Sequence, residues 1–260
     1  MHQASVGFHC PECTKQGTQK VYQGMGSLRV RPVLTQILIV VNVAVFMVGM
    51  VMYRSNALGN GSSQMQFDYG LIAKFAKGGF VYPGLGVGEG EWYRIVTSGF
   101  MHAGMFHVAV NMYALWILGR AVESLGGRLR FGVIYGVSLA SGALGALLLT
   151  PGSLTVGASG AIFGLMGAVF LAQRAQGIPF RESPLLAVLL INLVITFGLG
   201  GISIGGHLGG LVGGAFAGWI LFDYGLRPGV DKRLPLAACG AIAGGCLVAA
   251  VVFATGWLPA

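Results

Sequence analysis

The sequence predicts an all-α fold: a polytopic bundle of helices embedded in a lipid bilayer. The first observation is composition, because 55% of the 260 residues are hydrophobic and only 9% are charged, whereas soluble domains carry about 25% charged residues. The second is that apolar spans of roughly 17–25 residues, the length of a bilayer crossing, recur along the chain. The third is the 45 glycines, because small residues let membrane helices pack closely.

Seven apolar spans follow a polar and basic segment at 1–31. We place them at 33–53, 103–123, 131–149, 156–173, 184–200, 203–222 and 235–257. The one long connection runs from Arg54 to about Phe100, and its middle mixes apolar residues with Lys74 and Lys77. That middle stretch suits the membrane interface. The apolar run starts after about thirty polar residues, so no cleavable signal peptide is evident.

The distribution of basic residues predicts the orientation. With the N-terminus inside, twelve of the 16 Lys and Arg residues fall in inner segments, and only Arg54, Lys74, Lys77 and Arg94 fall in outer ones. Inner loops of membrane proteins are enriched in these residues. We therefore expect a multi-pass protein of the cell membrane with a cytoplasmic N-terminus and an extracytoplasmic C-terminus. The formal charge of +8 then requires no nucleic-acid partner.

Polar side chains inside apolar spans are costly and commonly mark a functional site. The second span holds His107 and Asn111, four residues apart and so on one helix face. The fourth span holds Ser159 and the sixth holds His207. These three spans enter from the predicted outer side, and His107, Ser159 and His207 each lie roughly 5–8 Å below that surface. The sequence therefore predicts that the three residues share one depth.

A serine hydroxyl and an imidazole at one depth can share a proton, which makes the serine a nucleophile. Glu123 and Asp223 lie at the inner ends of their spans, so no carboxylate is placed to complete a triad. We therefore predict a dyad of Ser159 as nucleophile and His207 as general base. Attack on an amide creates an oxyanion that needs donors, and the candidates are His107, Asn111 and the backbone N–H of Ser159. This chemistry requires no cofactor.

The dyad joins residues 48 positions apart and so requires close approach of two helices. Small residues at a spacing of four leave a bare face on each helix. They are Gly206, Gly210, Gly214 and Gly218 on the sixth span, and Gly160, Gly164 and Ala168 on the fourth. We predict that these faces pack together. Hydrolysis also needs water at this depth, so an outward-open polar cavity is implied.

These residues resemble the rhomboid family of intramembrane serine proteases over about residues 30–223. The GxSG motif of that family is matched by Gly157-Ala158-Ser159-Gly160, its HxxxN pattern by His107 and Asn111, and its glycine-flanked histidine by His207. A further family histidine is matched by His102. Phe163, one turn after the serine, matches the aromatic that packs on the catalytic histidine. The Trp-Arg pair of the first loop is similar to Trp92-Tyr93-Arg94 with a tyrosine inserted, and Arg94 keeps its place relative to Thr97.

The resemblance implies a serine endopeptidase that needs no cofactor and whose site opens outward. It implies a six-helix core, here 32–223, so that 224–260 adds a loop and a seventh transmembrane helix. The expected partners are the lipid bilayer and substrates with single transmembrane helices, cut near their outer ends. The sequence does not indicate the substrate or the oligomeric state.

Other interpretations exist for the same residues. A lone GxSG is commonly a packing motif, and three histidines can form a zinc site, although no HExxH is present and Ser159 would then be idle. His102 suits either a helix end or a functional role, and Arg94 either a loop cation or a residue that pins the first loop. The competing function is a non-catalytic rhomboid-like membrane-protein binder or a transporter. A transporter would usually bury Asp or Glu in mid-membrane, and a pseudoprotease would lack Ser159 or His207.

The N-terminal segment carries one CxxC, formed by Cys10 and Cys13, with His2 and His9 nearby. A structural zinc site needs four ligands. The segment is similar to the end of the cysteine-rich, zinc-binding head of some bacterial rhomboids, which places the native start upstream of Met1. The alternative is a disordered cytosolic tail with two reduced thiols.

Overall fold

The computed structural model divides the chain into two units, 1–31 and 32–260, and describes most of the second. The described residues are 2–3, 8–9, 31–53, 63–77, 80–183, 185–198 and 201–258. In the first unit, β1 (His2–Gln3) pairs antiparallel with β2 (Phe8–His9). Cys10 and Cys13 lie outside the described residues, so the zinc interpretation of this segment stays a prediction.

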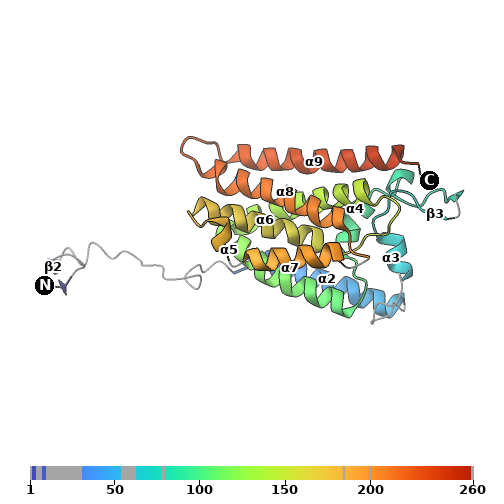
Figure 1. Ribbon diagram of the computed structural model, residues 1–260, viewed down its shortest axis with the longest axis horizontal. Coiled ribbons are helices and arrows are strands. Elements are labelled where there is room, and N and C mark those ends of the chain that lie inside the picture. Colours follow the sequence, from blue (N-terminus) through green and yellow to red (C-terminus); the bar gives the residue numbers. More distant parts are fainter. Residues whose placement is uncertain are drawn as a thin grey trace. The chain divides into compact units, whose positions relative to one another are not determined.

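The second unit is a helical bundle (Figure 1), which confirms the predicted all-α class. Its long helices are α2 (Val33–Met52), α5 (Met105–Leu149), α6 (Ser159–Ala175), α7 (Leu185–Gly198), α8 (Ile204–Phe222) and α9 (Arg233–Gly256). Length and composition allow α2, α5, α8 and α9 to cross a membrane, while α6 and α7 are shorter apolar helices.

Helix α5 contains two of the seven predicted spans. Gly127 has φ 76° and ψ 173°, which lies outside the helical region and favours glycine. This residue therefore divides α5 into two arms, which correspond to the predicted spans 103–123 and 131–149. Each of the seven predicted spans thus corresponds, over most of its length, to a helix or to one arm of α5.

The long connection between α2 and α5 is largely structured. It contains α3 (Gln64–Tyr69), the antiparallel pair β3 (Ala76–Lys77) and β4 (Phe80–Val81), η2 (Val87–Glu89), α4 (Arg94–Thr97) and η3 (Ser98–Phe100). The connection is also tied to the loop before α6, because Leu71 and Thr155 form an isolated antiparallel bridge. The loop before Ser159 is therefore held by the connection. Short 3-10 turns, η4 (Phe180–Glu182) and η5 (Tyr224–Leu226), follow α6 and α8.

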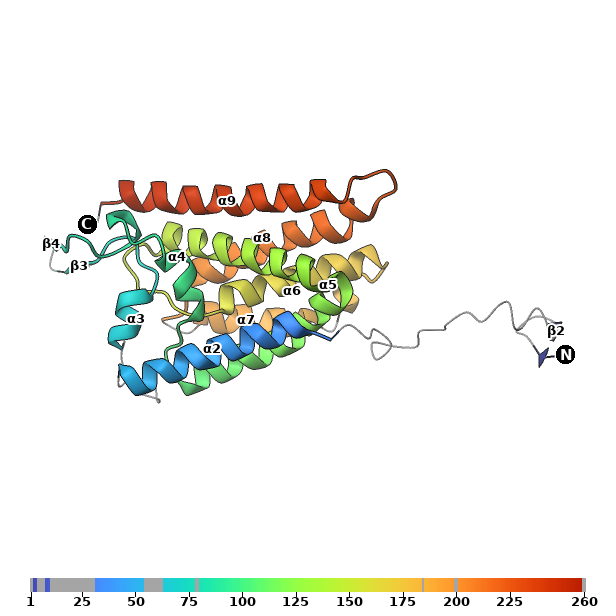
Figure 2. The same ribbon diagram turned by 180° about the vertical axis from the view of Figure 1, so that it is seen from behind.

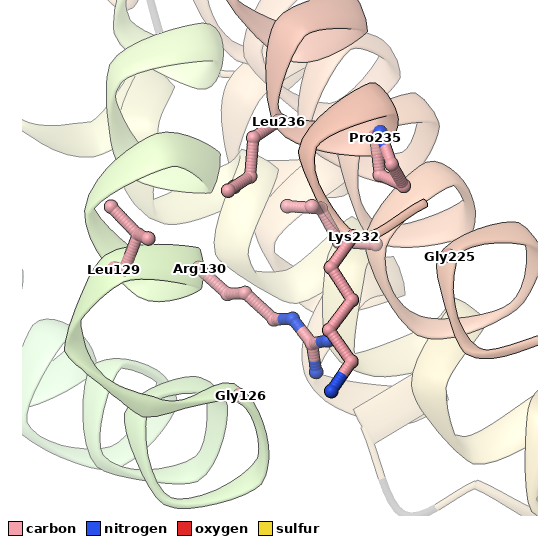
Figure 3. A pocket seen from close by; sticks show the side chains of 8 residues that line it. Gly126, Leu129, Arg130, Gly225, Lys232, Pro235 and Leu236 are labelled. Atoms are coloured by element: carbon pink, nitrogen blue, oxygen red, sulfur yellow. The ribbon is translucent and has the colours of Figure 1, made fainter. Parts of the chain in front are cut away.

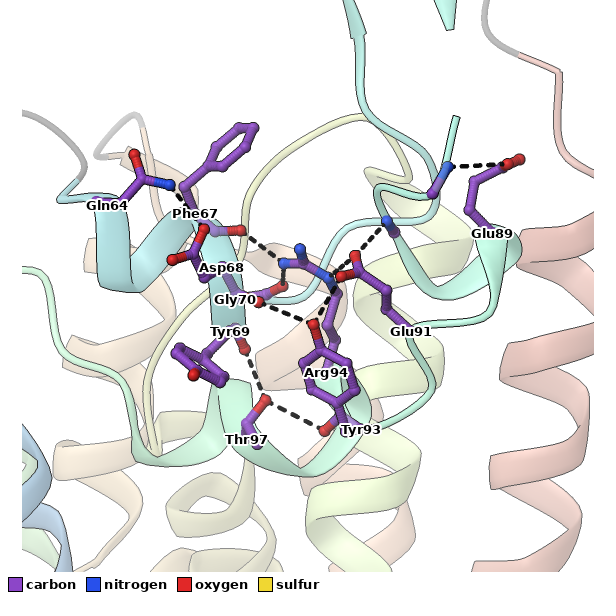
Figure 4. Close-up of polar contacts among 12 residues, drawn as sticks. Gln64, Phe67, Asp68, Tyr69, Gly70, Glu89, Glu91, Tyr93, Arg94 and Thr97 are labelled. Carbon is purple, nitrogen blue, oxygen red and sulfur yellow. Dashed lines mark hydrogen bonds and ion pairs between the residues drawn. The ribbon is translucent and has the colours of Figure 1, made fainter. Parts of the chain in front are cut away.

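Arg94 organises this connection from a buried position (Figure 4). Its Nε donates to Glu91 Oε2 at 2.6 Å, and its Nη1 donates to the carbonyl oxygens of Phe67 at 2.7 Å and Gly70 at 2.8 Å. Tyr93, the inserted tyrosine, donates from its hydroxyl to Glu91 Oε1 at 2.6 Å. Arg94 thus joins α3 to α4, as expected of a residue that pins the loop.

Glu123 anchors the start of α2 from the first arm of α5. Its carboxylate accepts hydrogen bonds from the backbone N–H groups of Leu34 at 2.9 Å and Thr35 at 2.8 Å, and from the Thr35 hydroxyl at 2.7 Å. The first N–H groups of a helix lack partners within the helix, so this side chain from α5 acts as a cap. Figure 2 shows α2 running alongside α5 as a result.

The predicted glycine faces of α6 and α8 do pack together. A Cβ added to Gly210 would collide with the backbone oxygen of Gly160, and one added to Gly214 would collide with the backbone of Gly164. A Cβ on Gly218 would lie 2.6 Å from the Cα of Ala168. A neighbouring face of α8 is equally close to the second arm of α5, where Gly205 meets Gly145. Helix α8 therefore packs closely against both α5 and α6.

Helix α9 packs mainly on α5, and its C-terminal end reaches η2 in the connection between α2 and α5, which we call the first loop. Ala250 and Ala254 are buried there in a cluster with Leu71, Val87 and Ala146. Lys74 donates from Nζ to the carbonyl oxygen of Thr255 at 2.9 Å. The added C-terminal helix is thus integrated with the rest of this unit.

Candidate active site

Ser159 and His207 are in hydrogen-bonding contact in this structure. Ser159 is the first residue of α6, His207 lies in the first turn of α8, and His207 Nε2 is 2.8 Å from Ser159 Oγ. Both helices begin at this end of the bundle, which is why residues in their first turns share one depth. The 48-residue separation along the chain is therefore closed by the packing of α6 against α8.

The glycines explain how the two helices come near enough. A Cβ added to Gly160 would lie 3.0 Å from the backbone oxygen of Gly206. Real Cβ atoms rarely approach another atom so closely, so a larger residue at position 160 would separate the helix starts. Gly160, one residue after the serine, and Gly206, one residue before the histidine, thus keep the pair within reach.

Phe163 packs flat against the imidazole of His207. Their ring centroids are 4.1 Å apart with an angle of 17° between the planes. Phe163 is four residues after Ser159, so its side chain lies on the same face of α6. The stacked ring restricts rotation of the imidazole, and the predicted contact between Phe163 and His207 is present.

The second ring nitrogen of His207 contacts Thr196, which sequence reasoning did not single out. Thr196 lies on α7, is 1% exposed, and places Oγ1 2.7 Å from His207 Nδ1. The same hydroxyl donates to the carbonyl oxygen of Asn192 at 2.6 Å. Threonine hydroxyls bonded to the carbonyl four residues earlier are ordinary in apolar helices. The sequence alone therefore carries no signal for the contact with His207.

His107 faces the space beside Ser159. A Cβ added to Gly157 would lie 3.0 Å from both Nε2 and Cε1 of His107 and 3.6 Å from Ser159 Oγ. Gly157 has φ 127° and donates from its backbone N–H to the Ser98 oxygen at 2.9 Å. The absence of a side chain at 157 thus leaves room between the serine hydroxyl and the imidazole.

Asn111 lies one turn below His107 on the same helix. Its Nδ2 donates to the carbonyl oxygen of His107 at 2.9 Å, and its Oδ1 is buried with no hydrogen-bond partner among the described residues. An amide nitrogen carries two hydrogens, so one N–H of Asn111 remains for another acceptor.

His102 and Arg94 are arranged differently. The His102 ring is buried edge-on to that of His107, with centroids 5.1 Å apart, and neither of its nitrogens has a hydrogen-bond partner among the described residues. Its backbone oxygen accepts from Gln66 Nε2 at 2.8 Å. The hydrogen bonds of Arg94 all remain within the first loop. His102 therefore packs on the site, whereas Arg94 supports the loop around it.

The histidines do not form a metal centre in the part of the chain that the structure describes. No group of three His, Cys, Asp or Glu side chains there is arranged to hold an ion. The three-histidine zinc interpretation therefore lacks the geometry it needs.

Comparison with known proteins places this arrangement in a family. The family model described as "Rhomboid domain" matches residues 89–224, which is more than half of the 260 residues. The chain belongs to the rhomboid family. This rhomboid segment includes α4 to α8 and hence every residue of the site described above.

Curated relatives agree with this assignment. The chain is 38% identical over 134 residues to "Rhomboid protease GluP" of Bacillus subtilis, covering 50% of this chain and 26% of that protein. It is 37% identical over 134 residues to "Putative rhomboid protease YdcA" of the same organism, covering 50% and 67%. It is 30% identical over 179 residues to "RHOMBOID-like protein 7" of Arabidopsis thaliana, covering 64% and 56%. The chain thus spans about a quarter of the length of GluP and just over half of that of the Arabidopsis protein.

Rhomboid membership and the apolar helices together identify a multi-pass membrane protein of an intramembrane protease family.

Proposed function

We propose that this rhomboid is an intramembrane serine endopeptidase that hydrolyses peptide bonds in or near the transmembrane helices of other membrane proteins. Ser159 is the nucleophile and His207 the general base. The observation that carries this proposal is the 2.8 Å contact between Ser159 Oγ and His207 Nε2. Such a contact between a hydroxyl and an imidazole is the signature of an activated serine.

The reaction proceeds in two halves. As Ser159 Oγ attacks the carbonyl carbon, its proton passes to His207 Nε2, and the imidazolium then gives that proton to the leaving amine. The resulting ester joins the carbonyl half of the substrate to Ser159. Water attacks the ester while His207 takes the water proton, which then returns to Ser159 Oγ as the acid is released.

The oxyanion is stabilised from the side of Gly157. The backbone N–H of Ala103 donates to His107 Nδ1 at 3.2 Å, so a neutral His107 carries its own proton on Nε2, next to Gly157. The first N–H groups of α6, starting with that of Ser159, add the positive end of the helix dipole. Asn111 supplies a further N–H. These donors need no metal or cofactor to act.

We propose that 32–223 form the protease core, that 224–260 add the seventh transmembrane helix, and that the site opens on the extracytoplasmic side. The charge distribution supports this orientation. The substrates are membrane proteins, because the site lies at the ends of apolar helices and a substrate must approach it from the bilayer.

A fluorophosphonate probe tests the proposal in intact membranes. The wild-type chain should be labelled and should cleave a transmembrane substrate, whereas Ser159→Ala should lose labelling and lose cleavage by on the order of 10⁴-fold or more. Ser153→Ala is the matched control, because Ser153 lies exposed in the loop before α6. Cleavage by inserted Ser159→Ala at the wild-type rate would refute the mechanism. A folded wild-type chain that binds substrate but neither labels nor cleaves would favour the non-catalytic binder.

A further inference from the structure

A cavity of about 220 Å³ opens where α5, α8 and α9 come together (Figure 3). Its walls include the α5 bend at Gly126, the end of α8 with η5, and the first turn of α9. Ser159 and His207 lie in the first turns of α6 and α8, at the other end of the bundle. The cavity is therefore separate from the proposed active site.

Two basic side chains line this cavity and extend toward the same side of it, Arg130 from α5 and Lys232 from the position just before α9 (Figure 3). Among the described residues, neither lies within 4.0 Å of a carboxylate. The acids nearest in sequence have other partners. Glu123 bonds the start of α2 and lies 4.0 Å from Arg128 Nε, Asp223 pairs with Arg227 at 2.6 Å, and Asp231 accepts from the backbone N–H of Arg233 at 2.9 Å. Two like charges at one opening, neither of them in an ion pair among the described residues, favour binding of an anion.

The rest of the lining is apolar. It includes Leu129 of α5, Leu221 of α8, and Pro235 and Leu236 of α9. A ligand that satisfies both parts carries a negative charge beside an apolar body. The helices around the cavity are long and apolar enough to cross a membrane, so lipid headgroups lie at the level of their ends.

We propose that this cavity binds the headgroup of an anionic phospholipid, with the phosphate between Arg130 and Lys232 and the start of an acyl chain against the leucines. Basic pockets between membrane helices are a recurrent means of lipid recognition. Under the predicted orientation the lipid belongs to the cytoplasmic leaflet. Inorganic phosphate shares the charge but has nothing to place against the apolar lining.

Reconstitution into phosphatidylcholine nanodiscs, with or without phosphatidylglycerol, tests the site. Phosphatidylglycerol should raise the thermal unfolding midpoint of the wild-type chain and should remain bound in native mass spectrometry. Each cation near an anionic lipid strengthens binding by about fivefold, so Arg130→Gln with Lys232→Gln should weaken retention by about 25-fold. Lys232→Gln alone should weaken retention of phosphatidylglycerol by about fivefold. Because Lys232 is exposed, this single variant keeps the test valid if the double variant does not fold.

The matched control is Arg174→Gln with Arg181→Gln, which removes two exposed cations away from the cavity. It should retain phosphatidylglycerol like the wild type. Equal losses in the two double variants would mean general attraction to anionic lipid and would overturn the proposal. An equal midpoint shift with inorganic phosphate alone would overturn it too, because the site would then bind free anions.

A different observation concerns the proton on His207. The Thr196 hydroxyl has one hydrogen and two close partners, the carbonyl oxygen of Asn192 at 2.6 Å and His207 Nδ1 at 2.7 Å. A carbonyl oxygen only accepts, so the hydroxyl hydrogen goes to Asn192. His207 Nδ1 must then be the donor to Thr196 Oγ1.

These two hydrogen bonds determine the tautomer of the imidazole. A neutral ring with its proton on Nδ1 has a lone pair on Nε2, which faces Ser159 Oγ. The opposite tautomer would present an N–H to the serine and could not accept its proton. We infer that Thr196 is a positioning residue that holds His207 in the tautomer able to act as a base, an inference that rests on the proposed function. Among the described residues of α7, the buried ones are Leu189 and Thr196. Thr196 therefore lies on the side of α7 that faces the bundle and His207.

Thr196→Val removes the acceptor while keeping the shape. The kcat of this variant should fall by about 10- to 100-fold, with little change in KM. The loss should be smaller than the roughly 10⁴-fold loss of a serine protease without its aspartate, because threonine is uncharged. Thr196→Ser should restore the rate. Thr255→Val is the matched control, since the Thr255 hydroxyl makes the same bond to the carbonyl four residues earlier, Val251, and no contact with a histidine.

Nitrogen-15 NMR of the imidazoles gives a readout that a purely structural role would not move. The chain has 5 histidines, so the His207 signals can be assigned from single variants. The wild type should show protonation at Nδ1, and Thr196→Val a mixture of tautomers. Wild-type rate and tautomer in Thr196→Val would overturn this inference and leave the proposed function intact. Cleavage of substrate by Ser159→Ala at the wild-type rate would instead refute the proposed function.

Discussion

The backbone N–H of Ala103 donates a hydrogen bond of 3.2 Å to Nδ1 of His107. This bond gives His107 the opposite tautomer from the one that Thr196 selects for His207. One imidazole thus presents an N–H to the space beside Gly157, and the other presents a lone pair to Ser159. Two residues of the same type are thereby suited to two roles, oxyanion donor and general base.

These roles predict different losses for the donors and for the base. His107→Ala should lower kcat by on the order of 10²–10³, and Asn111→Ala by less, because other donors remain. Both variants should still be labelled at Ser159 by a fluorophosphonate, since neither residue takes the serine proton. His207→Ala should abolish cleavage and labelling together. A properly inserted Asn111→Ala chain that cannot be labelled would show that Asn111 is structural.

Close packing of α6 on α8 makes Gly210 intolerant of a side chain. Gly210→Ala should destabilise the folded chain by about 3 kcal/mol, because the added methyl meets the backbone of Gly160, which has no flexible side chain to move aside. Thermal unfolding in detergent measures this change. Gly244→Ala on α9, where an added Cβ has no neighbour within 4 Å, should be neutral or stabilise by up to about 1 kcal/mol. Equal effects of the two variants would contradict the predicted packing.

Acid should loosen the first loop through Glu91. Burial alone raises the pKa of Glu91, but hydrogen bonds from Tyr93, Arg94 and the Gly86 N–H outweigh it and hold the pKa below its usual value. The ionised carboxylate therefore stabilises the folded loop at neutral pH. This stabilisation is lost as the pH falls from about 4.5 through the folded-state pKa.

Limited proteolysis between α3 and α4 should accordingly increase in this acidic range for the wild type. Glu91→Gln should be cleaved more readily at neutral pH and respond less to acid. Glu182→Gln, in the exposed turn η4, is the control and should behave as the wild type. If proteolysis of Glu91→Gln rose in acid as much as that of the wild type, a group other than Glu91 would be responsible for the acid effect.

The orientation is tested by reporter fusions. A reporter active only outside the cytoplasm should be active after Ala260 and silent near Arg128 or Arg181. The physical reason is that twelve of the 16 basic residues lie on the predicted inner side. Activity of a fusion at Arg128 would reverse the orientation and place the site on the cytoplasmic side.

The sequence by itself determined the class of the fold and singled out Ser159, His107 and His207 as candidates for the site. Apolar spans show directly in composition, because every crossing helix must be covered with apolar side chains. Ser159, His107 and His207 are conspicuous for the same reason, since polar groups are rare in such spans. The spacing of four in the glycines also predicted correctly which faces of α6 and α8 meet, because helical periodicity is local.

Only the tertiary structure decided how the site is completed. Thr196 reaches His207 from the preceding helix, and Glu123 caps α2 from a helix far along the chain, so both contacts depend on how the helices pack. A threonine in an apolar helix and a glutamate at a helix end look ordinary until their partners are placed. The cavity between α5, α8 and α9 likewise forms from three segments, and its charge becomes evident only because Arg130 and Lys232 line the same opening. Helix packing brings these partners together, and local sequence patterns do not specify it.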